Sequence, residues 1–518
     1  MTALTEFMGS PEYLLALPMI MLTLFGLGIL IIDLLLPEEW KVVNAWAAFI
    51  GLVFTAAAVH KIQLGFAAAG SSVIGRSAYQ GSLVVDNFAV FFFYLFLAAA
   101  AITVLISVRY LEIEREHHGE FYALILLSVV GMMAMTAGYD IVLLFIGLEL
   151  MAISTYVLVG FLRRDRRSNE AALKYLLLGA FSSGIFAYGL SLLYGLTAST
   201  NIQAIGMRLS QHLQAHPNDP VAIVALVTTA AGLFFKIAAV PFHQWAPDAY
   251  EGAPTSITGY MSVAGKAAAW ALLLRVFVGG SGVVPAGLWA LRPLYLPILI
   301  FVAVATMTGG NLAALTQTNL KRLFAYSSIA HVGYMLLGLV AGSERGISVT
   351  GIKGILIYLM VYTFMNLGVF AVITSLRRRD IIGDELDDIT GLFFKHPTEA
   401  VLMLVFLLSL AGIPPLAGFY GKYFIFLALI ETGHYVLASL AVLYVAVALY
   451  YYIRIANAMF MRTPLDAEPV RLSAAQAAAL AVTGIATIYI GIFPEWFIRA
   501  ATWSMGLGQM PPVAGLMR

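Results

Sequence analysis

Apolar stretches about as long as a bilayer is thick recur along the whole chain. In the segment 121–138 (FYALILLSVVGMMAMTAG) every face of a helix would be apolar. A helix needs about 20 apolar residues to cross a membrane, whereas a membrane β-strand alternates apolar and polar side chains. Only 11% of the 518 residues are charged, too few to cover a soluble globule of this size. The sequence therefore predicts an all-α, polytopic membrane protein.

We predict about 14 transmembrane helices. Their approximate bounds are 13–36, 42–64, 83–108, 119–137, 139–161, 171–195, 220–250, 254–278, 287–314, 319–342, 351–376, 398–430, 434–461 and 472–504. The seventh contains Pro241 and Pro247, and the twelfth contains Pro414 and Pro415. Because proline removes a backbone donor and clashes with the preceding turn, both spans should break near mid-membrane.

The two broken spans lie five apart in the order of spans, which predicts two five-helix repeats. Five is odd, so the second repeat would enter the membrane from the opposite side and be inverted. The expected organisation is an N-terminal three-helix segment (1–118), a first repeat (119–280), a second inverted repeat (281–462) and a C-terminal helix (463–518). Broken helices at corresponding positions of inverted repeats point to an ion or substrate path.

The distribution of basic residues predicts the orientation. Two basic clusters follow odd-numbered spans, namely Arg163, Arg164, Arg166 and Arg167, and Arg377, Arg378 and Arg379. That side of the membrane would hold 17 of the 29 lysines and arginines, against 9 on the other side. The positive-inside rule makes it the cytoplasmic side. Both termini are therefore expected on the periplasmic side of a bacterial inner membrane, with the first apolar segment kept as a mature helix.

Four charged residues are expected deep in the membrane: Glu149, Lys236, Lys266 and Lys422. A charge at the centre of a membrane helix costs about 2.5–3.5 kcal/mol on insertion scales, so such residues are usually paired or functional. Structural ion pairs would explain any one of them. Four together, two of them in broken helices, favour a proton relay, because burial favours a neutral lysine and a nearby carboxylate favours a charged one.

Other polar residues are weaker candidates. His331, within span ten, could bridge protons between the repeats or be a hydrogen-bonded core histidine. Lys174 lies near a helix end, where a lysine extends its ammonium group to the interface. Asp140 should cap the start of span five, and Asp248 and Glu251 should anchor the broken seventh span near the surface.

Several kinds of site are disfavoured on this chain. The absence of cysteine excludes disulfides, iron–sulfur clusters and thiolate metal sites. The balance of 29 basic against 28 acidic residues argues against nucleic acid as a partner, and the His117-His118 pair has no evident third metal ligand. With no Walker A or GxGxxG motif either, we expect no cofactor or metal here. Energy would have to come from an ion gradient or from partner subunits.

Five sequence blocks carry a resemblance to a known family. They are FFKIAAVPFHQWAPDAYEGAPTSITGYMSVAGKAAAW (234–270), NLKRLFAYSSIAHVGYMLLGL (319–339), GIPPLAGFYGKYFIF (412–426), GLELMAISTYVLVGF (147–161) and EAALKYLLLGAFSSG (170–184). They resemble the antiporter-like subunits of the proton-pumping NADH:quinone oxidoreductase, respiratory complex I, and the resemblance covers about 140–510. This family shares ancestry with the Mrp-type sodium/proton antiporters.

The resemblance favours the N branch among the L, M and N branches of the family. The run PDAYEGAP (247–254) is similar to the N branch, where L and M usually carry a histidine variant, and Lys422 is glutamate in M. The long C-terminal lateral helix of L has no counterpart before Arg518.

Specific roles follow from the resemblance. It implies that Glu149 pairs with Lys236, that Lys266 connects two half-channels, and that Lys422 ends the second one. Lys174 falls in a matching block, whereas His331 matches no firm role.

The resemblance also implies partners. Flavin, iron–sulfur clusters and quinone would be bound by other subunits, and the neighbours would be the antiporter-like subunit M and small membrane subunits such as K and J. The alternatives are an Mrp-type cation/proton antiporter subunit and a structural spacer. Co-purification with the other complex I subunits would distinguish a complex I subunit from an Mrp-type antiporter subunit.

Overall fold

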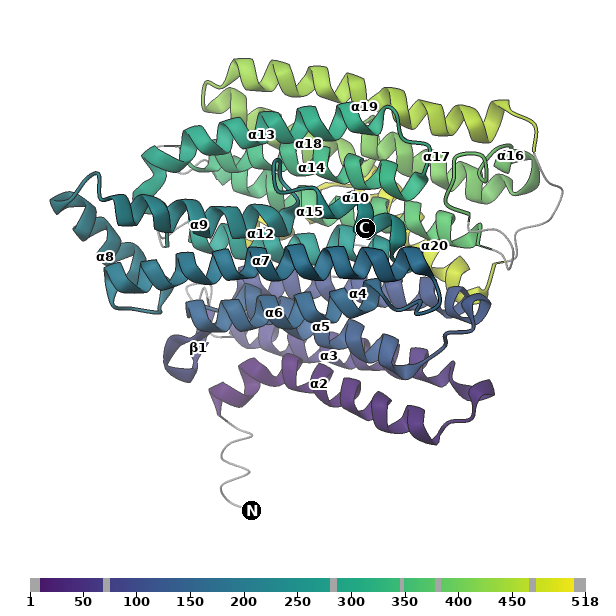
Figure 1. Ribbon diagram of the computed structural model, residues 1–518, viewed down its shortest axis with the longest axis horizontal. Helices are drawn as coiled ribbons and strands as arrows, with labels where there is room; N and C mark the ends of the chain where they lie inside the picture. The colour runs from purple at the N-terminus through teal and green to yellow at the C-terminus, as the bar shows by residue number, and fades with distance from the viewer. Residues whose placement is uncertain are drawn as a thin grey trace.

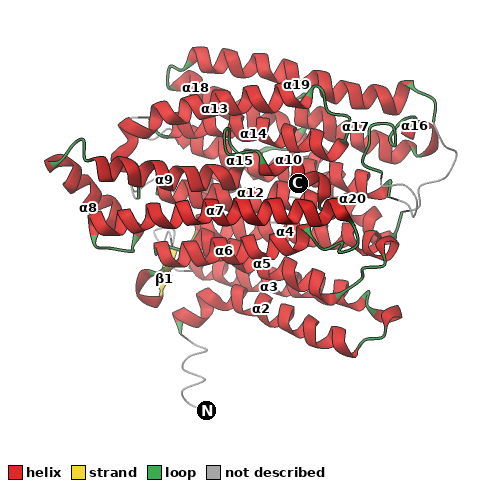
Figure 2. Cartoon of the chain, viewed as in Figure 1, coloured by secondary structure: helices red, strands yellow, loops and turns green. Residues whose placement is uncertain are grey.

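The computed structural model describes residues 10–68, 75–279, 287–344, 349–377, 383–464 and 472–506. Within these ranges the long helices run side by side in one bundle, and the loops gather at its two ends (Figures 1 and 2). This arrangement confirms the prediction of an all-α, multi-pass membrane protein. Of the second basic cluster, Arg378 and Arg379 lie outside the described residues.

The first part of the chain contains the helices drawn from purple to teal in Figure 1 and a short β-hairpin. The elements are α2 (Pro11–Leu35), α3 (Val43–Ala68), β1 (Gly75–Ala78), β2 (Leu83–Asp86), α4 (Asn87–Glu114), α5 (Gly119–Ala137), α6 (Ile141–Val159), α7 (Arg166–Thr197), α8 (Ile202–Ala215) and α9 (Pro220–Ile237). The two strands pair antiparallel, with Gly75 opposite Asp86.

The second part contains the shortest helices as well as the most buried ones. Its elements are α10 (Trp245–Gly252), α11 (Thr255–Tyr260), α12 (Lys266–Phe277), α13 (Arg292–Ala314), α14 (Leu320–Gly342), α15 (Val349–Ser375), α16 (Leu392–Lys395), α17 (Pro397–Ala411), α18 (Ala417–Glu431), α19 (Tyr435–Met461), α20 (Ala474–Ile492) and α21 (Glu495–Ser504). A π-helical turn, Met261–Gly265, joins α11 to α12.

Thirteen helical stretches in the described ranges are long and apolar enough to cross a membrane. The predicted twelfth span is not among them, because it is divided into α17 and α18, each of 15 residues. The predicted seventh span is also divided, since α9 ends at Ile237 and α10 starts at Trp245. Both expected breaks are therefore present, and the predicted count of fourteen is reached when α17 and α18 cross as one unit.

Three local predictions were wrong or incomplete. Pro247 does not break a helix, because it lies in the first turn of α10, where a missing N–H leaves no bond unmade. The predicted span 472–504 is two helices that separate at Pro494. The amphipathic helix α8, which projects at the left end of the bundle in Figure 1, was missed because its sequence is too polar for a span.

Short polar side chains cap the N-termini of many helices. Asp140 accepts a hydrogen bond from the Val142 N–H at the start of α6, as predicted for this residue. Equivalent N-caps are Asp86, Asp165, Asn201, Asp219, Asn319 and Ser473. Because the first N–H groups of a helix have no partner within it, these caps fix where each helix starts.

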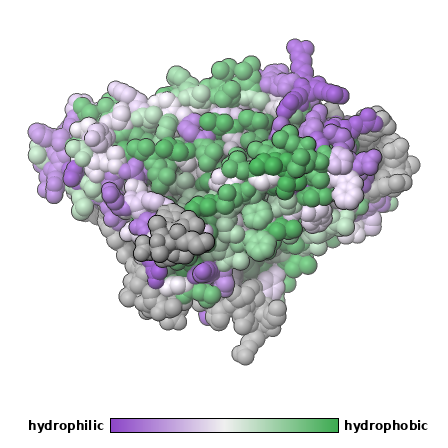
Figure 3. All heavy atoms as spheres, turned by 90° about the horizontal axis from the view of Figure 1, so that it is seen from below, coloured by the Kyte–Doolittle hydropathy of each residue, from purple (hydrophilic) through white to green (hydrophobic). Residues whose placement is uncertain are grey.

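The centre of the bundle is formed by α11–α12, α14 and α15. The most apolar 18-residue window of each is 94% buried, against 28% for α19 at the edge. On the face shown in Figure 3, hydrophobic side chains cover the middle and hydrophilic ones gather at both ends. A polar group on the central helices must therefore find its partners inside the protein.

A buried ion pair joins the N-terminal helices to α12. Arg275 contacts both carboxylate oxygens of Asp86, at 2.6 and 2.7 Å, and also donates to the Thr136 carbonyl and the Tyr139 hydroxyl. Asp86 starts α4 and Tyr139 follows α5, so three helices meet at one guanidinium. The carboxylate and the two further oxygen acceptors offset the free-energy cost of burying the Arg275 charge.

Two glycines bring α5 and α6 close together. A Cβ atom added at Gly131 would lie 2.5 Å from the Met151 nitrogen, and one added at Gly147 would lie 2.9 Å from the Gly131 carbonyl oxygen. Backbone atoms cannot move aside as a side-chain tip can. Small residues of this kind let membrane helices pack closely.

We expect Gly131→Val to lower the free energy of unfolding by about 3 kcal/mol, the upper end of the usual range for overpacking. Thermal unfolding of the purified protein would measure the loss. Gly184→Val is the matched control, since a Cβ atom at Gly184 in α7 meets nothing within 4 Å. Equal stability of the two variants would contradict the close approach of α5 and α6.

Candidate functional site

The break after α9 exposes backbone groups that find new partners. Ala238 adopts the left-handed conformation (φ 58°, ψ 43°) and ends the helix. The carbonyl of Phe235 accepts a hydrogen bond from the Trp245 indole at 2.9 Å, and the N–H of Val240 donates to Thr306 at 3.0 Å. Irregular backbone at membrane depth is tolerated when the protein satisfies it in this way.

Lys236 lies in the last turn of α9, just before this break, and its side chain is buried. Its Nζ donates a hydrogen bond to the Tyr156 hydroxyl of α6 at 3.2 Å. Lys236 and Glu149 form no ion pair within 4 Å, and the Oε1 atom of Glu149 has no hydrogen-bond partner. The structure therefore places a tyrosine at the lysine and shows no direct contact between the two charged residues.

Glu149 lies on α6, two helical turns before Tyr156, and is partly buried. Its Oε1 atom is buried without a hydrogen-bond partner. On the same side of α6, Ile146 and Ile153 are more than half exposed, at 57% and 55%. Glu149 thus lies on a side of α6 that faces the outside of the bundle.

Lys266 is the first residue of α12 and follows the π-helical turn directly. Its Nζ donates to the Ser328 hydroxyl of α14 at 2.6 Å and lies 5.6 Å from the centre of the Tyr250 ring of α10. Both Lys266 and Ser328 are nearly fully buried. Single-turn π segments inside helices recur at functional sites, and this one directs a lysine at the centre of the bundle.

His331 lies one helical turn after Ser328 and makes two hydrogen bonds. Its Nδ1 is 2.5 Å from the Tyr358 hydroxyl of α15, and its Nε2 is 3.0 Å from the Tyr452 hydroxyl of α19. Tyr452 also bonds to Ser327 at 2.6 Å. His331 is thus a hydrogen-bonded core histidine, which was one predicted reading. It also joins α14 to hydroxyls of α15 and α19, which suits the bridging role.

Lys422 lies near the start of α18, opposite the end of α17. Its Nζ donates to the carbonyls of Leu410 and Ala411 at 2.8 and 2.7 Å, which the break at Gly412 leaves free. A cation is favourable at a helix C-terminus. The ammonium also lies 5.4 Å from the ring centre of Tyr334, which follows His331 on α14.

These residues form a polar row through the centre of the bundle. Lys266 bonds to Ser328, and the His331 cluster lies one helical turn further along α14. The Tyr334 ring lies between His331 and the Lys422 ammonium, with ring centroids 6.1 Å apart and the ammonium 5.4 Å away. No hydrogen bond or ion pair among the described residues links Lys236 to Lys266. Aromatic side chains lie between them. Adjacent rings there are Tyr156, Tyr175, Trp245 and Tyr250, with centroids 4.6, 4.4 and 6.4 Å apart.

Lys174 does not join this row. It is exposed on α7 and pairs with Glu170 and Asp248, each at 2.9 Å. Asp248 also bonds to Arg322, as does Glu251, so the two acids anchor α10 as predicted. In the part of the chain that the structure describes, no group of three or more His, Cys, Asp or Glu side chains is placed to hold a metal ion.

The tyrosines and serines of the row were not predicted from the sequence. Ser327, His331 and Tyr334 have helical spacing (i, i+4, i+7) in AYSSIAHVGY, so a search for polar residues on the face of His331 could have found them. Tyr156, Tyr250 and Tyr452 are distant in sequence from the residues they contact, and no local pattern indicates them.

Comparison with known proteins identifies the family. The model of the family described as NADH:quinone oxidoreductase/Mrp antiporter, TM, matches residues 138–448. The chain belongs to this family. The matched region runs from the residue after α5 into α19, so it includes every residue of the polar row except Tyr452.

Individual members of the family are similar over nearly the whole chain. NADH-quinone oxidoreductase subunit N 1 of Koribacter versatilis is 62% identical over 519 residues, covering 100% of both chains. Subunit N 2 of Solibacter usitatus is 53% identical, covering 96% of this chain and 98% of its own. A chain in the structure of respiratory complex I from Thermus thermophilus with bound aureothin is 31% identical, with a TM-score of 0.75, covering 93% of this chain and 98% of that one.

We expect Ser328→Ala to destabilise the protein, because it leaves the buried Lys266 ammonium without its hydroxyl acceptor. The expected loss in the free energy of unfolding is about 1–3 kcal/mol. Thermal unfolding would measure it. Ser183→Ala is the matched control, since the buried Ser183 hydroxyl has no hydrogen-bond partner. If Ser183→Ala cost as much as Ser328→Ala, the contact to Lys266 would not be stabilising.

Proposed function

We propose that the chain is the proton-translocating membrane subunit N of an NADH:quinone oxidoreductase. The observation that carries this proposal is the set of three buried lysines, Lys236, Lys266 and Lys422, at the centre of the bundle. Hydroxyl groups and His331 lie between Lys266 and Lys422, and aromatic rings lie between Lys236 and Lys266. Relatives that match the whole chain are subunits N of this enzyme. Quinone reduction would occur in other subunits of the complex, with subunit M and small membrane subunits such as K and J as neighbours.

The chemistry of the row suits proton transfer. Serine and tyrosine hydroxyls and the imidazole of histidine can both donate and accept a hydrogen bond, so a proton can enter on one side and leave on the other. A lysine accepts and releases the proton at each end of such a chain. Because burial favours the neutral lysine and the charge of Glu149 favours the charged one, a change near Glu149 would alter the proton occupancy of Lys236.

The two broken helices support the proposed inverted repeats, 119–280 and 281–462. The helices α9 and α17 are each followed by a residue in the left-handed conformation, Ala238 and Gly412, and a buried lysine lies beside each break. The flanking segments, 1–118 and 463–518, would attach to these units. In this arrangement Lys236 and Lys422 are the corresponding lysines of the two repeats, and Lys266 and His331 lie between them.

We expect Lys236→Ala and Lys422→Ala to reduce proton translocation coupled to quinone reduction in an assembled complex. Removal of a group that carries the proton should slow transfer through this chain by about 100-fold or more, the lower range for general acid–base groups. Membrane vesicles with NADH as donor and a pH-sensitive dye provide the assay.

Lys61→Ala is the matched control, because Lys61 is an exposed lysine on the membrane helix α3, outside the row. Full retention of both coupled activities in Lys236→Ala and in Lys422→Ala would refute the relay.

We also propose that the end of the bundle carrying Arg163–Arg167 is cytoplasmic and that both termini are periplasmic in a bacterial inner membrane. The chain has no cysteine, so a single introduced one reports cleanly. Arg166→Cys should react with a membrane-impermeant maleimide only from the cytoplasmic side. Labelling from the periplasmic side would reverse the proposed orientation.

A further inference from the structure

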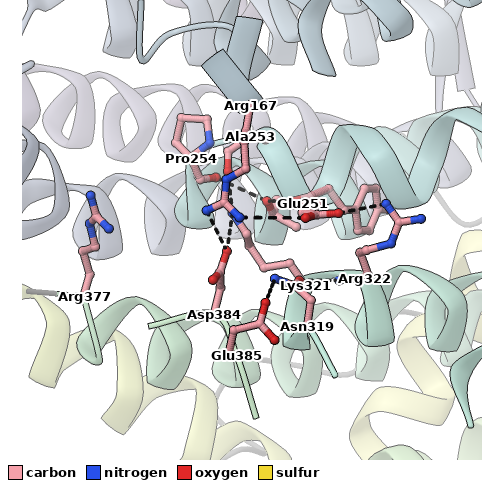
Figure 4. A network of polar contacts seen from close by, with 12 residues as sticks. Arg167, Glu251, Ala253, Pro254, Asn319, Lys321, Arg322, Arg377, Asp384 and Glu385 are labelled. Atoms are coloured by element: carbon pink, nitrogen blue, oxygen red, sulfur yellow. Dashed lines mark hydrogen bonds and ion pairs between the residues drawn. The ribbon is translucent and has the colours of Figure 1, made fainter. Parts of the chain in front are cut away.

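Eight charged side chains of alternating sign form a continuous chain at the end of the bundle where α7 and α14 begin. Figure 4 shows its centre, where Arg167 reaches both Glu251 and Asp384. The ion pairs join, in order, Glu170, Lys174, Asp248, Arg322, Glu251, Arg167, Asp384 and Lys321, with N···O distances from 2.7 to 3.8 Å. The chain joins α7, α10, α14 and the segment before α16.

The short helix α10 lies at the centre of this chain. Asp248 contacts Lys174 and Arg322, and Glu251 contacts Arg167 and Arg322. Lys321 makes a third contact to α10, because its Nζ donates a hydrogen bond at 3.0 Å to the carbonyl of Ala253, the C-cap of the helix. With eight residues and no side-chain N-cap, α10 is too short to be a stable helix on its own. Its position therefore depends on these external contacts.

The opposite side of α10 contacts the lysine row. The Tyr250 ring lies 5.6 Å from the Lys266 ammonium. Trp245 donates to the carbonyl of Phe235, the residue before Lys236, and stacks on Tyr175. The helix thus lies between the charged chain and the gap that separates Lys236 from Lys266.

The charges of the chain are matched and its inner end is buried. The side chains of Lys321 and Asp384 are 4% and 3% exposed, whereas those of Asp248 and Glu251 are 33% and 26% exposed. Neutralising either acid on α10 leaves Arg322 with one carboxylate fewer. It also gives the eight paired side chains a net positive charge. Because both acids belong to α10, losing their ion pairs would weaken the contacts that hold this helix in place.

We propose that Asp248 and Glu251 are positioning residues that hold α10, and with it Tyr250 and Trp245, against Lys266 and the end of α9. The inference rests on the proposed function, because it assigns these acids a role in proton transfer through the lysines. Neither acid touches a lysine of the row. Their effect on transfer passes through α10.

The test compares Asp248→Asn and Glu251→Gln in the assembled complex. Hydrogen exchange of the α10 amides, followed by mass spectrometry, reports whether the helix is held. Proton translocation per electron in vesicles reports the consequence for transfer. We expect faster exchange in α10 and a fall in translocation of about tenfold, within the range of up to about 100-fold that a displacement of about 1 Å can cause.

Two sets of controls separate positioning from general damage. Glu120→Gln removes an acid that pairs with Arg163 and not with a residue of α10, and it should change neither readout. Asp248→Glu and Glu251→Asp keep the charge and should recover most of the translocation. They also provide the comparison if the neutral variants fail to assemble.

Unchanged exchange in α10 would overturn the proposal. So would faster exchange with normal translocation, provided that Lys266→Ala lowers translocation in the same vesicles. Normal translocation by Lys266→Ala would instead refute the proposed function, and the positioning role with it, whatever the exchange rates of α10.

Discussion

An ammonium group inside the hydrocarbon region must find its hydrogen-bond acceptors within the protein, and the centre of this structure is arranged around that requirement. A regular helix has no free carbonyl to offer, because each is bonded four residues along the chain. The breaks and the polar side chains of neighbouring helices supply the acceptors. Lys422 uses two freed carbonyls, Lys266 a serine hydroxyl and Lys236 a tyrosine hydroxyl.

The two helix breaks differ in which group binds the backbone carbonyls at the end of the helix. After α17, the freed carbonyls of Leu410 and Ala411 bind the lysine itself. After α9, the carbonyl of Phe235 accepts the Ala238 N–H and the Trp245 indole, and Lys236 bonds to the Tyr156 hydroxyl. Lys236 therefore has one hydroxyl acceptor where Lys422 has two carbonyls.

Much of the fold was predictable from local sequence, because membrane insertion fixes segment length and composition. The spans, both breaks, the buried lysines and the Asp140 cap follow from residue type and depth. The partners of those lysines do not, since Tyr156 lies 80 residues from Lys236 and Ser328 lies 62 residues from Lys266, and only tertiary packing joins them. The interruption at Pro494 was missed although Glu495 follows it directly, where a new helix begins.

The π-helical turn Met261–Gly265 makes the direction of Lys266 a matter of residue count. Such a turn accommodates one residue more than a regular helix does, and each residue of an α-helix rotates the following ones by about 100°. Removing one residue from this turn would restore a regular helix without deleting any group of the polar row. Lys266 would then point about a quarter-turn away from Ser328. Deleting a single codon in this segment would therefore change the direction of the Lys266 side chain while every residue of the polar row stays in the sequence. The contact of Lys266 with Ser328 thus depends on the length of the turn as well as on the lysine.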